Sequence, residues 1–156
     1  MSETQALANR LERTFIGPMW HGPALAEVLG GVTHEQAMER PVASAHTIWE
    51  LVLHIITWVD IPHERLGGAP RKDVVTDEDW PSPPRVATED AWTAALTRLE
   101  ERHRALASTV KAMGDDQLDE KVVGHDYTVR VMLDGVVEHG TYHGGQIALL
   151  KKLVAC

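Results

Sequence analysis

Apolar residues recur at the spacing of an α-helix along four long stretches of the chain. In the first stretch, Leu7, Leu11 and Phe15 follow one another at intervals of one helical turn. Strict alternation of apolar and polar residues, which would indicate strands, is almost absent. The pattern therefore predicts an all-α fold, with long helices at about Glu3–Phe15, Thr47–Leu66, Thr88–Met113 and Thr128–Leu153.

The connection between the second and third stretches is long and rich in proline. It runs from Gly67 to Ala87 and includes the run Trp80-Pro81-Ser82-Pro83-Pro84. Such a segment is uncommon inside a compact domain, whereas in four-helix bundles a long crossover allows the second and third helices to run parallel. We therefore predict a four-helix bundle with a long crossover between helices 2 and 3. The polar segment Asp115–Tyr127 is expected to be a loop.

Length, charge and composition indicate a single globular domain and argue against nucleic-acid and membrane partners. The chain has 156 residues, enough for one hydrophobic core, and residues 1–156 are predicted to form one domain. A formal net charge of −8 argues against a nucleic-acid partner, which would require a basic surface. No apolar stretch is long enough to span a bilayer, and no cluster of Lys and Arg suggests a membrane surface. The first residues lack the pattern of a secretory signal, so a cytoplasmic location is expected.

Two histidines of the fourth predicted helix are the strongest candidates for chemistry. His139 and His143 are four residues apart, which places them one above the other on a helix face that is otherwise apolar. A buried imidazole needs partners for both ring nitrogens. A shared metal ion satisfies two imidazoles together, because each donates a lone pair to the ion and a proton to a neighbouring group. The alternative is that each is an ordinary hydrogen-bonded core histidine.

The same helix contains four glycines: Gly135, Gly140, Gly144 and Gly145. Each costs about 0.5–1 kcal/mol relative to alanine in a helix interior, so their presence needs a reason. The missing side chains would allow a neighbouring helix to approach closely, or would leave space for a ligand. The sequence leaves both explanations open.

His54 is the obvious third ligand, because it interrupts the apolar run Leu51–Ile56 of the second predicted helix. Three neutral imidazoles leave coordination positions open for water or substrate, as in catalytic rather than closed structural sites. Imidazole ligands suit zinc, nickel, copper or iron and argue against calcium or magnesium. The single cysteine, Cys156, excludes a cysteine-based zinc site and a disulfide within the chain.

Glu50 and Gln146 are candidates for a supporting role at this site. Glu50 lies one turn before His54 and could orient it, but its capping-box spacing from Thr47 favours a helix cap. Gln146 could form a hydrogen bond beside His143, or it could be an ordinary buried amide.

Three aromatic side chains are further candidates. Trp58 could wall the pocket, although core packing is the more common role for a tryptophan in this position. Tyr142 could offer its hydroxyl to a ligand, with packing as the favoured alternative. His21 could line the pocket mouth or be a fourth ligand, although loop histidines are commonly just exposed. The remaining histidines are expected at the surface or in caps: His34, His46, His63, His103 and His125.

Two segments resemble the DinB-like superfamily: Thr47-Ile48-Trp49-Glu50-Leu51-Val52-Leu53-His54-Ile55 and His139-Gly140-Thr141-Tyr142-His143-Gly144-Gly145-Gln146-Ile147. Trp20-His21-Gly22-Pro23 also looks like a segment of one branch, and the resemblance spans essentially the whole chain. It implies an up-down-down-up bundle, often dimeric. It also implies one divalent metal ion, commonly nickel or zinc, on His54, His139 and His143. Activities in the wider superfamily include thiol-dependent transfer and isomerisation, and some members are described as metal-dependent hydrolases.

Three functional hypotheses follow from the residues and the resemblance together. The first is a metalloenzyme, either a thiol S-transferase or a hydrolase, that acts on a small molecule, with a low-molecular-weight thiol as a candidate partner. The second is a non-catalytic stress-response or binding module with a structural or adventitious metal. The third is a structural homodimer whose histidines bind no metal.

Overall fold

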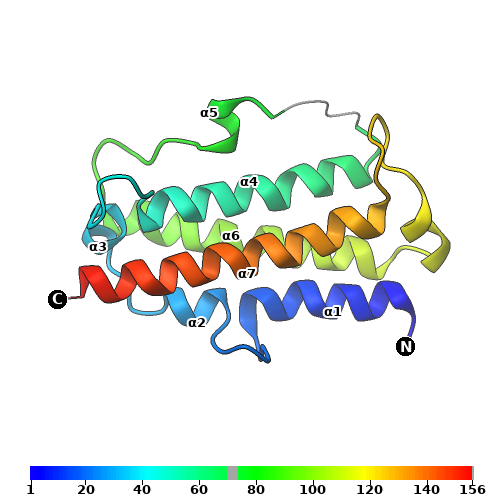
Figure 1. Ribbon diagram of the computed structural model, residues 1–156, viewed down its shortest axis with the longest axis horizontal. Helices are drawn as coiled ribbons and strands as arrows, with labels where there is room; N and C mark the ends of the chain where they lie inside the picture. Colours follow the sequence, from blue (N-terminus) through cyan, green and yellow to red (C-terminus); the bar gives the residue numbers. More distant parts are fainter. Residues whose placement is uncertain (70–73, 156) are drawn as a thin grey trace.

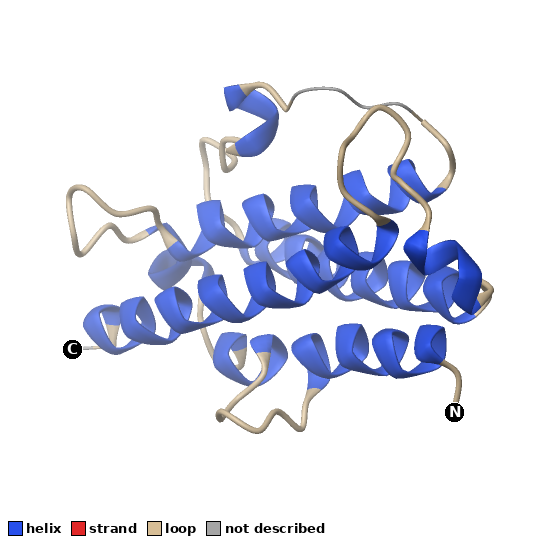
Figure 2. Cartoon of the chain, turned by 45° about the vertical axis from the view of Figure 1, so that its right-hand side comes forward, coloured by secondary structure: helices blue, strands red, loops and turns tan. Residues whose placement is uncertain are grey.

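Four long helices account for most of the chain in the computed structural model, which describes residues 1–69 and 74–155 (Figure 1). They are α1 (Glu3–Ile16), α4 (Ile48–Leu66), α6 (Glu89–Lys111) and α7 (Val129–Val154). Four short elements lie between them: α2 (Leu25–Leu29), α3 (His34–Met38), α5 (Thr76–Asp79) and the 3-10 helix η1 (Asp115–Asp119). Since the described residues form no strand, the prediction of an all-α fold is confirmed (Figure 2). None of the helices in this part of the chain is long and apolar enough to cross a membrane.

The four long helices form a bundle in which α1 and α4 each pack against both α6 and α7. Figure 1 shows α1 and α7 running from right to left, and α4 and α6 from left to right. Residues 74–88, which precede α6, run along the outside of α4, and their short helix α5 packs on α4. The sequence predicts only loops where α5 and η1 lie, because elements of four or five residues are too short to show a helical period. Residues 70–73 of the predicted linker, and Cys156, lie outside the described residues.

Side-chain caps set the first turn of α4. The Thr47 hydroxyl accepts a hydrogen bond from the Glu50 backbone N–H at 3.2 Å, and the Glu50 carboxylate accepts one from the Thr47 N–H at 2.8 Å. This reciprocal pair is the capping box that the spacing predicts. It fixes the start of α4 two turns before His54.

Two buried tryptophans hold α4 against α6. The indole rings of Trp49 on α4 and Trp92 on α6 have centroids 5.0 Å apart, and both side chains are almost wholly buried. Trp92 Nε1 donates a hydrogen bond to the Val32 carbonyl at 2.8 Å, so its one polar group is satisfied inside the core. One face of α4 therefore packs against α6, and the face that contains His54 lies toward α7.

The four glycines of α7 divide into two pairs. A Cβ built on Gly140 would lie 2.8 Å from Thr14 Cγ2 of α1, and one on Gly144 would lie 3.4 Å from Leu25 Cδ2 of α2. These two glycines therefore allow α1 and α2 to approach α7 closely. A Cβ on Gly135 or Gly145 would meet no atom of the described residues within 4 Å. Both explanations left open by the sequence therefore apply in this helix. Gly140 and Gly144 allow close approach of other helices, whereas Gly135 and Gly145 border open space.

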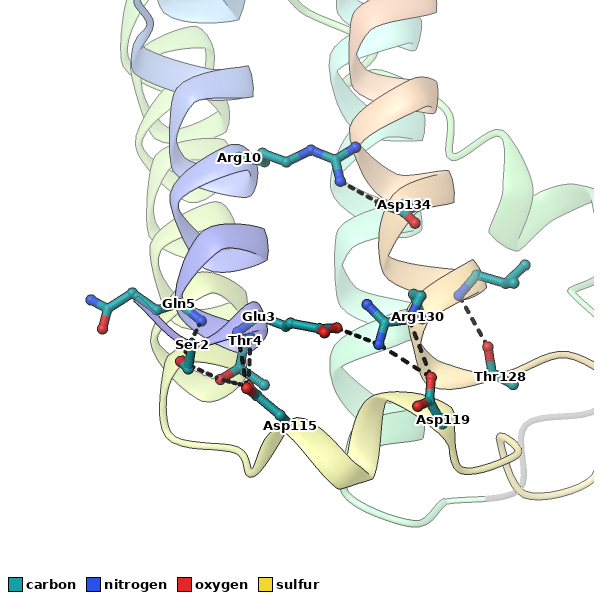
Figure 3. A network of polar contacts seen from close by, with 11 residues as sticks. Ser2, Glu3, Thr4, Gln5, Arg10, Asp115, Asp119, Thr128, Arg130 and Asp134 are labelled. Atoms are coloured by element: carbon teal, nitrogen blue, oxygen red, sulfur yellow. Dashed lines mark hydrogen bonds and ion pairs between the residues drawn. The ribbon is translucent and has the colours of Figure 1, made fainter.

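The start of α1 is tied to η1 by a network of polar contacts (Figure 3). The Asp115 carboxylate accepts hydrogen bonds from the backbone N–H groups of Glu3 at 3.0 Å and Thr4 at 2.9 Å. These bonds to Thr4 and Glu3 lower the pKa of Asp115. Arg130 of α7 pairs with both Glu3 at 2.6 Å and Asp119 at 3.2 Å. The N-terminal helix is therefore joined to the segment before α7 by charge-assisted bonds at an exposed end of the bundle.

The expectation that His103 lies at the surface or in a cap is wrong. Its side chain on α6 is 3% exposed, and its ring stacks on Phe15 of α1 with a centroid distance of 5.2 Å. Nδ1 donates to the Leu99 carbonyl one turn earlier at 2.9 Å, while Nε2 is buried without a hydrogen-bond partner among the described residues. Because its own helix satisfies one nitrogen, the ring packs as a largely apolar group. Burial lowers the pKa of His103, so the imidazole is neutral in the folded protein.

This buried imidazole should make the fold sensitive to acid. Since the pKa of His103 is lower in the folded than in the unfolded chain, unfolding takes up a proton and stability falls as the pH drops below about 6.5. We expect the metal-free protein to lose about 1.4 kcal/mol more stability between pH 7.5 and pH 5.5 than its His103→Leu variant. Urea denaturation at the two pH values measures this difference. Equal losses in the two proteins would show that His103 is not buried as a neutral group.

Candidate metal centre

Three histidines from two helices converge in the interior of the bundle. His54 comes from α4, and His139 and His143 come from successive turns of α7. One ring nitrogen from each lies within 4.8 Å of those of the other two, and Nε2 of His54 is 3.0 Å from Nε2 of His139. His54 and His143 are 5% and 6% exposed, and His139 is partly buried. The structure thus brings together the three residues that the sequence predicts as ligands.

Hydrogen bonds on the outer nitrogens orient two of the rings. His54 Nδ1 lies 2.6 Å from the backbone carbonyl oxygen of Asp79, which can only accept, so Nδ1 carries the proton. His143 Nδ1 in the same way donates to Gln146 Oε1 at 2.8 Å. In a neutral ring the other nitrogen then has a lone pair, so Nε2 of both rings is a donor atom for a cation. Metal-binding histidines in proteins are oriented by contacts of this kind.

All three imidazoles are held in the neutral form. Burial lowers the pKa of His139 to about 3, with further lowering from the positive charge that His143 or His54 would have when protonated. Burial also lowers the pKa of His54 and of His143. The lone pairs are therefore available at neutral pH, with no proton to be displaced before a metal ion binds.

The residues present fit a divalent transition-metal ion. A tetrahedral ion with bonds of about 2.0–2.1 Å holds its ligand nitrogens about 3.3 Å apart. The 3.0 Å between Nε2 of His54 and Nε2 of His139 is close to this separation, and the three ligand atoms lie within 4.8 Å of one another, so a bound ion would draw them closer together. A donor set of three neutral nitrogens also matches the preference of zinc or nickel over calcium or magnesium.

The histidine cluster faces an open hollow of about 430 Å³. The hollow is lined by the three histidines together with His46, Trp58, Asp79, Trp80, Tyr142 and Gln146. Small molecules can therefore reach the cluster from the hollow. An ion bound by the three imidazoles would keep a position directed at this hollow for a further ligand.

Comparison of the sequence with models of protein families identifies the family of this chain. The family model of the DinB superfamily matches residues 20–147. The chain belongs to the DinB superfamily. No match to this DinB protein was found among curated proteins or among solved structures.

Asp79 and Trp80, both from the crossover, are site residues that sequence reasoning missed. The Trp80 ring stacks face to face on His54, with centroids 3.8 Å apart, and on its other side stacks on His46 at 3.5 Å. Asp79 binds His54 through its carbonyl, and its carboxylate Oδ1 accepts a hydrogen bond from Trp58 Nε1 at 2.7 Å. The one available signal was a tryptophan inside a long proline-rich segment. That signal did not indicate which helix the crossover would cover.

The other candidates from the sequence lie in different places. Trp58 lines the hollow, with its ring 5.9 Å from that of His139, rather than filling the core. Tyr142 is 66% exposed at the mouth of the hollow, and its ring meets the edge of His143. Glu50 lies away from the cluster, because it caps α4 and pairs with Arg40 at 2.7 Å. His21 lines a separate small cavity between α2 and α7.

Gln146 offers a direct test of how the DinB site is oriented. We expect Gln146→Leu to weaken zinc binding by about 10–100-fold, because His143 loses the acceptor that fixes its ring. Gln146→Glu keeps an oxygen acceptor at the same distance along the side chain and should bind zinc at least as tightly as the wild type. Competition with a chromophoric zinc chelator measures both affinities. Wild-type affinity in the leucine variant would rule out this orienting role.

Proposed function

We propose that this DinB protein is a metalloenzyme that uses one divalent transition metal, nickel or zinc, bound by His54, His139 and His143. The observation that supports this most strongly is the convergence of three neutral imidazoles at the base of an open hollow. A closed structural site would surround its ion with four protein ligands, whereas these three face a space where a further ligand fits. When bound, the ion would supply a Lewis acid that lowers the pKa of a thiol or a water molecule in that space.

We propose thiol S-transfer as the reaction type, with hydrolysis as the alternative. Among the described residues, the lining of the hollow includes no cysteine, serine or lysine that could act as the nucleophile. We therefore propose that the nucleophile comes from outside the chain, as a small thiol or water. Zinc and nickel both accept sulfur ligands well, which favours the thiol.

The chain's own residues would position the reactants. The Asp79 carbonyl and Gln146 Oε1 hold the imidazoles of His54 and His143 with their lone pairs inward. The indole rings of Trp58 and Trp80 lie beside the histidine cluster and would present apolar surface to a substrate. The Asp79 carboxylate lies 3.2 Å from His54 Nδ1. Its negative charge would stabilise the partial positive charge that the His54 ring acquires when the ring donates a lone pair to the metal ion.

The proposal extends to the setting in which the enzyme works. We propose a cytoplasmic homodimer that binds a small-molecule substrate and neither nucleic acid nor membrane. The net charge of −8 supports the absence of a nucleic-acid partner. Exposed apolar side chains along the outer face of α7, Tyr142, Leu149 and Leu153, support a second copy as the partner.

Cobalt substitution tests the proposed reaction type. Titration of the cobalt-loaded protein with 2-mercaptoethanol should produce sulfur-to-cobalt charge-transfer absorption, while ethanolamine, which offers no sulfur, should not. A panel of thiols with an electrophile then tests turnover. If no thiol changes the cobalt spectrum but the loaded enzyme cleaves ester or amide substrates, hydrolysis replaces thiol transfer. If removal of the metal by a chelator unfolds the protein, the metal is structural and the enzymatic proposal fails.

A further inference from the structure

A second and larger cavity adjoins the metal centre along the groove between α4 and α7. Its volume is about 630 Å³, within the range of pockets that bury a whole organic ligand. It shares Trp58, Asp79 and His139 with the hollow at the histidine cluster. A molecule held in this cavity would therefore have one end beside the metal ligands.

The walls of this cavity are mainly apolar. Pro62 of α4 and Val131, Met132 and Val136 of α7 contribute to them, together with the indole of Trp58. Apolar walls favour a ligand whose body is a hydrocarbon or an aromatic ring.

Gly135 makes room for such a ligand. It lies within α7 and lines the cavity, and a Cβ built on it would meet nothing within 4 Å. No neighbouring helix needs the space, unlike the space beside Gly140. A larger residue here would project into the cavity and would also favour the helix. The cavity thus depends on a residue that helix stability alone would not select.

Arg65 contributes a permanent positive charge to the same cavity. Its side chain lines the cavity, yet the residue is only 8% exposed, and Nη1 donates a hydrogen bond to the Tyr127 hydroxyl at 2.6 Å. A guanidinium presents paired N–H donors, which suit two oxygens of a carboxylate or of a sulfonate. Asp79, the carboxylate of the same lining, is bound to Trp58 and His54, two turns of α4 and more before Arg65, so the positive charge lies at the end of the cavity away from the metal ligands.

We propose that this cavity is the pocket for the second substrate, an apolar molecule with one acidic group. The acidic group would lie near Arg65, the apolar body would lie against Gly135, and the reactive end would reach the space beside His139. Gly135 then limits the size of the substrate, and Arg65 selects for its negative charge. The reaction assigned to this pocket rests on the proposed function, whereas the binding of such a molecule does not require a metal.

Two fluorescent probes of similar size test the pocket directly. 8-Anilino-1-naphthalenesulfonate is an apolar anion, and N-phenyl-1-naphthylamine is its uncharged counterpart. We expect the wild-type protein to bind one equivalent of the anion at least tenfold more tightly than the neutral probe. Equal affinities for the two probes would overturn the assignment of an acidic ligand.

Variants of α7 locate the binding. Gly135→Leu should weaken the binding of both probes at least tenfold, because the new side chain occupies the cavity. Gly145→Leu makes the same change on the exposed side of the helix, where it also meets nothing within 4 Å, and should leave both affinities within twofold of the wild type. Unchanged binding to Gly135→Leu would overturn the location.

Arg65→Gln tests the charge, and the metal-free protein separates the two proposals. Arg65→Gln should abolish the preference for the anion while leaving the neutral probe bound. If this variant does not fold, the two-probe comparison in the wild type decides the question. Repeating the titrations on the metal-free wild-type protein should give the same affinities. If the wild-type protein binds the anionic probe but no metal, the proposed function is refuted and the assignment of the pocket stands. If it binds metal but not the anionic probe, only the assignment of the pocket is refuted.

Discussion

Replacing His143 by alanine is expected to weaken zinc or nickel binding by at least about 100-fold. The reason is that His143 supplies one of the three ligand nitrogens. Removing a residue that only forms a hydrogen bond to a metal ligand weakens metal binding by about 10–100-fold, and removing the ligand itself should weaken it more. Protein purified without a histidine tag should contain close to one metal ion per chain in the wild type and almost none in His143→Ala. Elemental analysis and competition with a chelator measure the two quantities.

His63→Ala is the matched control for this experiment. His63 also lies on α4, but its Nε2 is hydrogen-bonded to the Thr109 hydroxyl at 2.9 Å, outside the histidine cluster. Its replacement should leave the metal content unchanged. If His143→Ala retains one tightly bound ion, the assignment of the three ligands is wrong.

Gly140→Val is expected to destabilise the metal-free protein by about 3 kcal/mol, because the new side chain has no space. The added Cβ would lie 2.8 Å from Thr14 Cγ2, and the further methyl groups would enter the contact between α7 and α1. Thr14 cannot turn away without cost, since it is buried and its hydroxyl donates to the Arg10 carbonyl at 2.9 Å. For a domain of this size, the midpoint of thermal unfolding should fall by about 6–12 °C.

Gly145→Val provides the control for the same substitution in the same helix. No atom lies within 4 Å of a Cβ at position 145, so this variant should unfold within about 0.5 kcal/mol of the wild type or be slightly more stable. Thermal unfolding followed by circular dichroism compares the two variants. Equal midpoints would show that α1 and α7 do not approach each other as closely as the structure indicates.

The helices and the three histidines could be predicted from the sequence because both depend on local spacing. A helical period places Leu7, Leu11 and Phe15 on one face, and a separation of four residues places His139 above His143. His54 could be added because an ionisable residue inside an apolar run needs a partner. These arguments use only neighbours along a single helix, together with the requirement that buried polar groups be satisfied.

The residues that complete the site could not be predicted, because they depend on how distant segments meet. Asp79 and Trp80 act on His54 from the crossover, 25 and more residues along the chain, and no local pattern specifies which helix the crossover covers. The sequence leaves Trp58 open between the pocket wall and the core for the same reason, since its position in the wall depends on the hydrogen bond to Asp79. His103 was placed at the surface because a histidine is polar, although its own helix satisfies Nδ1 and allows the ring to be buried.

X-ray absorption spectroscopy of the zinc-loaded protein tests the central claim most directly. The claim is that His54, His139 and His143 bind a common ion and leave a position open to the hollow. The spectrum should show three nitrogen ligands at about 2.0–2.1 Å, identified as imidazoles by the outer-shell scattering of their rings, together with at least one further oxygen ligand that exogenous thiol replaces by sulfur. Fewer than three imidazoles, or four protein ligands that no thiol displaces, would contradict the account.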